Sequence, residues 1–226
     1  MSGKAQILTR IREALRDLAP VPGHHGEGAL HHGEPPKEFG GWLPQVGEGL
    51  DAQIAAFARN SEDLKTEFHV LENRAALPAR LAALGTENGW QRVATHRGAL
   101  TDAAVPALKL PTLQTDGGYD IAALEQCDAG ISECDALVAQ TGSILITGRS
   151  AGGRALSVLP PHHVVLVTRA QMVPDLPAAY ALLRQRYAAN WPSFMSFITG
   201  PSRTGDIERI LVLGAHGPKR LTVFLV

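Results

Sequence analysis

From Leu50 onward, segments with helical periodicity alternate with short extended apolar segments, and this alternation restricts the fold more than any other feature. The apolar spacing predicts helices at Leu50 to Leu64 and Ala75 to Leu84, and strands at Glu67 to Leu71 and Trp90 to Thr95. Strands that alternate with helices are typical of a mostly parallel sheet covered by helices. The sequence therefore predicts an α/β fold.

The second half of the chain continues the same alternation. It predicts one helix, at Pro177 to Ala189, and strands at Ala136 to Ala139, Ser143 to Thr147, Val164 to Thr168, Ser196 to Thr199 and Leu221 to Val226. Ligands of open α/β sheets bind beyond the carboxyl ends of the strands. The turns that follow strands are therefore where a site is expected.

The chain before Leu50 has a different character. An amphipathic helix is predicted within residues 1–19, because apolar residues recur there at intervals of three and four: Ile7, Leu8, Ile11, Leu15 and Leu18. Residues 20–49 are rich in Gly, Pro and His, which predicts a linker to the main domain at residues 50–226. The apolar side of the first helix is expected to dock onto the main domain, another subunit or a partner.

Charge and cysteine usage exclude several classes of protein. Lys+Arg at 21 nearly balances Asp+Glu at 22, so no broad basic surface for nucleic acid is expected. No apolar run approaches the roughly 18 to 20 residues of a membrane span, and the N-terminus lacks the pattern of a signal peptide, so a cytoplasmic location is expected. Cys127 and Cys134 are too few for a disulfide framework or a four-iron cluster, and both are expected to be buried.

A first candidate binding segment is the turn Thr141, Gly142 and Ser143 between two apolar runs. Gly142 allows backbone amides to approach a ligand, and the two hydroxyl groups add donors that suit a carboxylate or a phosphate. The same residues are equally typical of a β-hairpin turn that is stabilised by bonds between hydroxyl and backbone groups.

A second segment runs from Arg154 to His163. Arg154 has the geometry to bind an anion through two N–H groups. Pro160 and Pro161 lead into the most apolar strand and place His162 and His163 at its amino end. The two histidines are expected to make structural hydrogen bonds rather than to bind a metal, because adjacent residues of a strand point opposite ways. The histidine pairs of the linker are likewise read as solvated, and no metal site is expected.

A third segment follows the strand that ends near Thr199. It is a loop of small polar residues around one cation, formed by Thr199, Gly200, Ser202, Arg203, Thr204 and Asp206. Such a loop can surround an anion, although Asp206 could instead cap a following helical turn and pair with Arg203. His216 and Gly217 lie shortly afterwards, and His216 is a candidate for proton exchange. We expect Thr141–Gly142–Ser143, Ser202–Arg203–Thr204 and His216 to converge at the carboxyl edge of the sheet.

Four stretches together resemble the lactate-utilisation protein C family, also called the LUD domain. They are Asp135 to Ser143, Arg154 to His163, Gly200 to Glu208 and Leu213 to Pro218. The resemblance covers roughly residues 50–226. It implies a three-layer α/β/α sandwich with a mostly parallel sheet, similar to ribose-phosphate isomerases, glucosamine-phosphate deaminases and coenzyme A transferases.

The resemblance also implies an accessory subunit of a bacterial iron-sulfur system that oxidises L-lactate to pyruvate. Its partners would be a cysteine-rich subunit and an iron-sulfur subunit that carries the clusters, while this chain binds a small anion or a partner group and no cofactor of its own. Family members often have Glu where this chain has Gln140, so no acid/base role is assigned there. The alternative is a stand-alone enzyme that acts on a phosphorylated or coenzyme A-linked substrate.

Overall fold

The computed structural model describes residues 7, 9, 10, 12, 13, 44–207, 210–214 and 216–226. The chain divides into two units, Met1–Trp42 and Leu43–Val226, and the description below concerns the second. The residues described between 7 and 13 are helical. The rest of the predicted N-terminal helix, and residues 20–43 of the predicted linker, lie outside the described residues.

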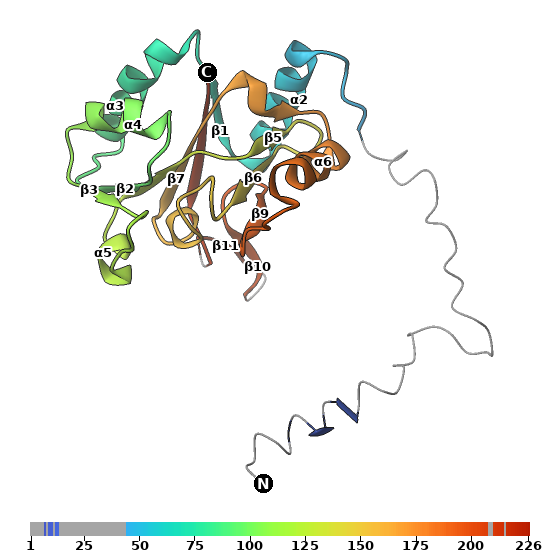
Figure 1. Ribbon diagram of the computed structural model, residues 1–226. Coiled ribbons are helices and arrows are strands. Elements are labelled where there is room, and N and C mark those ends of the chain that lie inside the picture. The colour runs from blue at the N-terminus through green and yellow to red at the C-terminus, as the bar shows by residue number, and fades with distance from the viewer. Residues whose placement is uncertain (1–6, 8, 11, 14–43, 208–209, 215) are drawn as a thin grey trace. The chain divides into compact units, whose positions relative to one another are not determined.

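A six-stranded parallel sheet forms the centre of the second unit (Figure 1). Its strands, in spatial order, are β1 (Glu67–Val70), β12 (Arg220–Leu225), β7 (His162–Val167), β4 (Ala129–Ser132), β2 (Val93–Thr95) and β3 (Thr112–Gln114). Every residue of β7 is buried, as expected for a central parallel strand that is covered on both faces.

Helices cover one face of this sheet. They are α3 (Leu77–Glu87) and the short α4 (Thr101–Ala104), with the 3₁₀ turns η1 (Arg74–Ala76) and η2 (Val105–Leu108) beside them. Leu77, Leu81 and Leu84 recur on one side of α3 and pack with Val164 and Leu166 of β7. The odd-numbered neighbours in β7 face the opposite way. The sheet is thus buried from both sides.

The other face is covered by α2 (Leu50–Leu64) together with a second, four-stranded sheet. Phe57 of α2 packs there with Val165 and Val167 of β7 and with Ile144 and Ile146 of the second sheet. The second sheet has the order β8 (Met172–Val173), β5 (Ala136–Val138), β6 (Ser143–Thr147) and β9 (Met195–Ile198). Its outer side packs against α6 (Leu176–Tyr187) through Ala179 and Leu183.

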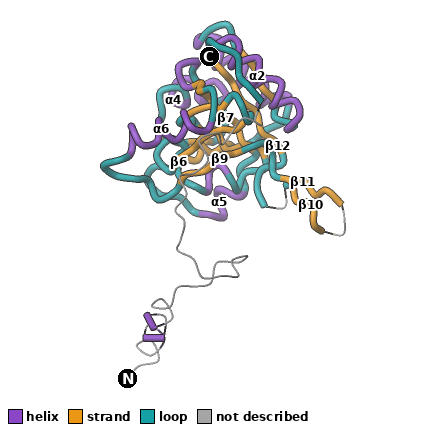
Figure 2. Tube along the Cα trace, turned by 90° about the vertical axis from the view of Figure 1, so that its right-hand side faces the viewer, coloured by secondary structure: helices purple, strands orange, loops and turns teal. Residues whose placement is uncertain are grey.

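The remaining elements connect these layers. They are α5 (Ile121–Glu125), η3 (Ala155–Ser157), η4 (Arg169–Gln171) and a two-stranded antiparallel hairpin, β10 (Arg203–Ile207) and β11 (Ile210–Leu213). Figure 2 shows this hairpin projecting from the body of the unit. Among the described residues, no helix has both the length and the apolarity that crossing a membrane requires.

The predicted α/β fold with a mostly parallel sheet between helices is confirmed, and the helix at Leu50–Leu64 matches its predicted bounds. Two expectations are wrong in detail. Strands β5, β6 and β9 belong to a separate sheet in which β6 runs antiparallel to both neighbours. The segment after Ser202, expected to be a loop, is strand β10, so Asp206 does not cap a helix.

Candidate functional site

A cavity of about 400 Å³ lies where β9 ends and where β7 and β12 begin. Its wall carries two arginines, two histidines and several hydroxyl groups, contributed by Arg154, Ser157, His163, Ser196, Thr199, Ser202, Arg203 and His216. None of the described residues that line it is an aspartate or a glutamate. A concave site with cations and no acidic group is complementary to an anion.

Arg154 lies in the connection between β6 and η3 and is exposed at the cavity. Its guanidinium carbon is 6.0 Å from the centre of the Phe194 ring, and this cation–π contact orients the side chain. Arg154 makes no ion pair with any described acidic side chain. Its N–H groups therefore remain free to bind a ligand.

Arg203 is the first residue of β10 and is held from the side by α2. Its Nη2 donates a hydrogen bond to the carbonyl oxygen of Leu64, the last residue of α2. The carboxyl end of a helix carries partial negative charge, which favours a cation at this place. A guanidinium has five N–H donors, so this bond leaves donors for a ligand.

The hydroxyl groups of Thr141, Ser143 and Thr199 form a chain. Thr141 Oγ1 donates to Ser143 Oγ at 2.8 Å, and Ser143 Oγ lies 2.8 Å from Thr199 Oγ1. Ser143 Oγ can donate its own hydrogen bond to Thr199 Oγ1. The Thr199 hydroxyl can then donate a hydrogen bond to a ligand in the cavity, which Thr199 lines. Thr141 and Ser143 thus support the site from behind without lining it.

Gly142 and Gly200 are glycines because both turns come very close to α2. A Cβ on Gly142, whose φ is 64°, would lie 2.9 Å from the Cβ of Asn60 and 2.9 Å from a methyl carbon of Leu64. A Cβ on Gly200 would lie 2.8 Å from the carbonyl oxygen of Leu64.

The hairpin turn, which was one of the two predictions for Thr141–Ser143, is confirmed by the antiparallel pairing of β5 with β6.

His162 and His163 point to opposite sides of β7. Nε2 of His163 lies 2.9 Å from Ser132 Oγ, and Nε2 of His162 lies 2.8 Å from Thr222 Oγ1. Thr222 donates its own proton to Glu67, so it must accept one from His162. The expectation that both histidines make structural hydrogen bonds is confirmed.

Burial keeps both histidines neutral. It lowers the pKa of His162 to about 4, with the positive charge of Arg220 acting in the same direction. It lowers the pKa of His163 to about 3, and neighbouring His162 adds to this effect. His163 also lines the cavity, and its Nδ1 has no hydrogen-bond partner among the described residues.

The position of the cavity corrects the expectation of a site at the carboxyl edge of the sheet. His163 and Leu221, which line it, are the second residues of β7 and β12, so the cavity lies at the amino ends of these strands. The expectation failed because β5, β6 and β9 are not part of the parallel sheet, and the rule for strand ends does not apply to them. At the carboxyl ends, Glu133 accepts hydrogen bonds from the backbone N–H groups of Leu100 and Thr101.

The candidate residues divide into three groups. Seven line the cavity: Arg154, Thr199, Gly200, Ser202, Arg203, His216 and Gly217. Thr141, Gly142 and Ser143 do not, and Thr204 and Asp206 lie in β10 with side chains outside the described part of the structure. The sequence reading missed Ser157, His163, Phe194 and Ser196 as lining residues. His163 and Ser157 lie in the stretch from Arg154 to His163, which the sequence analysis had singled out, whereas no local signal marked Phe194 or Ser196.

Cys127 and Cys134 are both buried, as expected, and burial raises the pKa of both thiols. Within the described ranges, no three side chains of His, Cys, Asp or Glu lie close enough to hold one metal ion. The polar side-chain groups that line the cavity are guanidinium, imidazole and hydroxyl groups.

Comparison with known proteins gives three findings. The model of the LUD domain matches residues 54–226. Two proteins called "Lactate utilization protein C" are each 34% identical over 112 residues, one from Anoxybacillus flavithermus, where the match covers 50% of this chain and 50% of that protein, and one from Bacillus subtilis, where it covers 49% and 47%. The chain thus spans about half the length of the curated relatives that it matches.

A similar solved structure is that of a DUF162 family protein from Deinococcus radiodurans, with a TM-score of 0.64 and 22% sequence identity. The similarity covers 80% of this chain and 99% of that one. At this level of identity the likeness concerns the fold, and it agrees with the layered α/β arrangement described above.

Proposed function

This chain belongs to the LUD domain family, and we propose that it takes part in bacterial lactate utilisation as a subunit that binds a small carboxylate. The observation that supports this proposal is the cavity between Arg154 and Arg203, which has no acidic residue among its described lining residues. The curated relatives named for lactate utilisation supply the class of substrate. Lactate and pyruvate are both small carboxylates.

The chemistry of the cavity suits a 2-hydroxy acid or a 2-oxo acid. The carboxylate would accept charge-assisted hydrogen bonds from Arg154 and Arg203, which are roughly twice as strong as neutral hydrogen bonds. The oxygen on the second carbon would lie near Thr199, whose hydroxyl is available as a donor. Neutral His163 offers a further polar group without adding a charge.

Electron transfer would take place on partner subunits in this proposal. Oxidation of lactate to pyruvate releases two electrons and two protons, and this chain contributes only two cysteines, both buried. We therefore propose an accessory role beside a cysteine-rich subunit and an iron-sulfur subunit, with the clusters on the partners and none on this chain. The alternative of a stand-alone enzyme is supported by the cavity volume of about 400 Å³, because that volume also accepts a larger phosphorylated ligand.

Arg154→Ala is expected to weaken the binding of lactate or pyruvate by about ten- to a hundredfold, because one charge-assisted contact contributes roughly 1.5 to 3 kcal/mol. Arg203→Ala is expected to have a similar effect and to lower the melting temperature slightly, since it also removes the bond to Leu64. Titration calorimetry on the purified full chain measures both dissociation constants.

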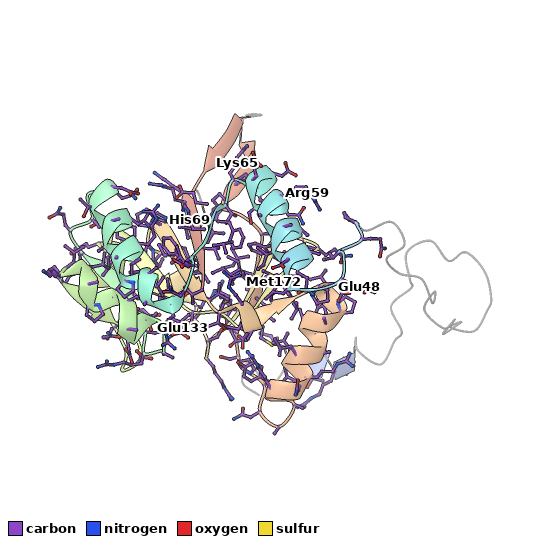
Figure 3. The ribbon with its side chains drawn as sticks, turned by 90° about the horizontal axis from the view of Figure 1, so that it is seen from above. Glu48, Arg59, Lys65, His69, Glu133 and Met172 are labelled. Atoms are coloured by element: carbon purple, nitrogen blue, oxygen red, sulfur yellow. The ribbon has the colours of Figure 1, made fainter. Side chains whose placement is uncertain are left out.

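Arg59→Ala is the matched control, because Arg59 lies exposed on α2 (Figure 3) and is not among the residues that line the cavity. It removes the same charge and is expected to leave binding unchanged. Unaltered affinity in both the Arg154 and the Arg203 variants would refute the proposal. So would the absence of any binding by the wild-type chain at acid concentrations well above ~1 mM, the usual upper limit for enzyme substrates. Tighter binding of phosphate esters than of lactate would favour the alternative.

A further inference from the structure

A second hollow, a groove of about 680 Å³, adjoins the cavity and shares Arg154 and Phe194 with it. Arg149 and Trp191 contribute the other large side chains of its wall. The described lining residues of this groove also include no aspartate or glutamate. The groove is therefore a second concave surface whose charged lining residues, among those described, are all arginines.

Trp191 gives the groove an aromatic surface. It lies in the connection between α6 and β9, and 47% of its surface is exposed. An indole ring is large and apolar, and leaving it in water forgoes the free energy that burial against another flat group would supply. Stacking of a base on such a ring contributes roughly 1 to 3 kcal/mol in nucleic-acid-binding proteins.

Arg149 and Arg154 give the groove two cations, each of which lies over an aromatic ring. The guanidinium carbon of Arg149 is 5.6 Å from the centre of the Tyr187 ring, and that of Arg154 is 6.0 Å from the centre of the Phe194 ring. A ring face orients a guanidinium without using its in-plane N–H donors. Neither arginine pairs with a described acidic side chain, so both retain donors for phosphate oxygens.

We propose that this groove binds a nucleotide, with the base stacked on Trp191 and the phosphates held between Arg149 and Arg154. An exposed indole beside two guanidinium groups that pair with no described acidic side chain matches the two parts of such a ligand, which are a flat ring and a compact group of negative charges. A small carboxylate would use only the cations and would leave the indole exposed. The nucleotide site adjoins the carboxylate site and shares Arg154 and Phe194 with it.

The test is titration of the full chain with ADP, with adenosine and pyrophosphate as the two halves of the probe. Calorimetry is expected to give a dissociation constant for ADP at least ten times lower than that for either half. Arg149→Ala and Trp191→Ala are each expected to weaken ADP binding by about tenfold or more, which corresponds to a loss of about 1.4 kcal/mol. Arg59→Ala is expected to leave ADP binding unchanged, because Arg59 lies outside the groove.

Equal affinity for pyrophosphate and ADP, or full ADP affinity in Trp191→Ala, would refute stacking on the indole. No heat of ADP binding to the wild-type chain would refute the site. Trp191→Ala is also titrated with lactate, whose binding it is expected to leave unchanged, since Trp191 does not line the carboxylate cavity. Loss of ADP binding with intact lactate binding thus separates this proposal from the proposed function.

Discussion

Replacement of Asp135 by alanine is expected to lower the free energy of unfolding by about 2 to 4 kcal/mol, because it removes a buried acceptor that two partly exposed donors share. The Asp135 side chain is 2% exposed, and its Oδ1 accepts hydrogen bonds from Arg186 Nη1 at 3.1 Å and from Tyr187 Oη at 2.6 Å. Both donors lie in the last turn of α6, so the carboxylate ties this helix to the residue before β5.

The sign of the stability change depends on whether Arg186 and Tyr187 find other hydrogen-bond partners once the Asp135 carboxylate is removed. Arg186 is 41% exposed and can regain water, whereas the Tyr187 hydroxyl would lose its short bond. Burial and the bond to Asp135 raise the pKa of Tyr187, so the phenol remains a protonated donor throughout the usual pH range. The loss of acceptors and the small void both act against the folded state.

Urea unfolding of the full chain measures this loss as a lower midpoint at an unchanged slope. Asp102→Ala is the matched control, since Asp102 pairs with Arg97 on the surface, where the two side chains are 48% and 71% exposed. Surface pairs contribute about 0 to 1 kcal/mol, so the control is expected to change little. If both variants unfolded at the wild-type midpoint, the Asp135 network would not be a stabilising element.

The second large effect is a loss of stability as the pH falls from about 6.5 to 5. In the unfolded chain, His162 and His163 take up protons near pH 6.5. In the folded chain their pKa values are about 4 and about 3, because both imidazoles are buried. The unfolded state therefore binds more protons in this window. The contribution of the two histidines to the free energy of unfolding is fully present above pH 6.5, and it is lost as the pH drops toward the folded pKa values.

The size of this effect follows from the two pKa values. Each histidine contributes about 1.4 kcal/mol per pH unit below pH 6.5, so the pair accounts for about 4 kcal/mol at pH 5. Urea unfolding at pH 7, 6 and 5 measures the slope, in a window that lies above the ordinary pKa values of carboxyl groups. His163→Gln is expected to remove about half of the slope that this pair supplies, and a double variant with His162→Gln the whole of that share. The smaller contribution of His69, whose pKa burial also lowers, is expected to remain. A slope that is as steep in the double variant as in the wild type would assign the pH dependence to other groups.

Much of the fold could be predicted from the sequence, because helices and strands follow local periodicity. The predicted helices at 50–64, 75–84 and 177–189 correspond to α2, α3 and α6, and the last predicted strand corresponds to β12. Strands β3, β4, β8, β10 and β11 were missed.

The candidate site was predictable only in part. Arg154, Arg203 and His216 stood out because charged or titratable residues among glycines and prolines are conspicuous in a sequence. Phe194 and Ser196, which complete the wall, belong to ordinary apolar and polar surroundings. Their role depends on the pairing of β9 with β6, which joins Ser196 to Ile146 across fifty residues of chain.

The sequence by itself determined the longer helices, most of the strands and which way neighbouring side chains of a strand point. The opposite directions of His162 and His163 follow from the period of two in any strand. Only the tertiary structure decided that β5, β6 and β9 form a second sheet and that the cavity opens at the amino ends of β7 and β12. Periodicity depends on neighbours a few residues apart, whereas strand pairing depends on the packing of distant segments, and no local pattern records it.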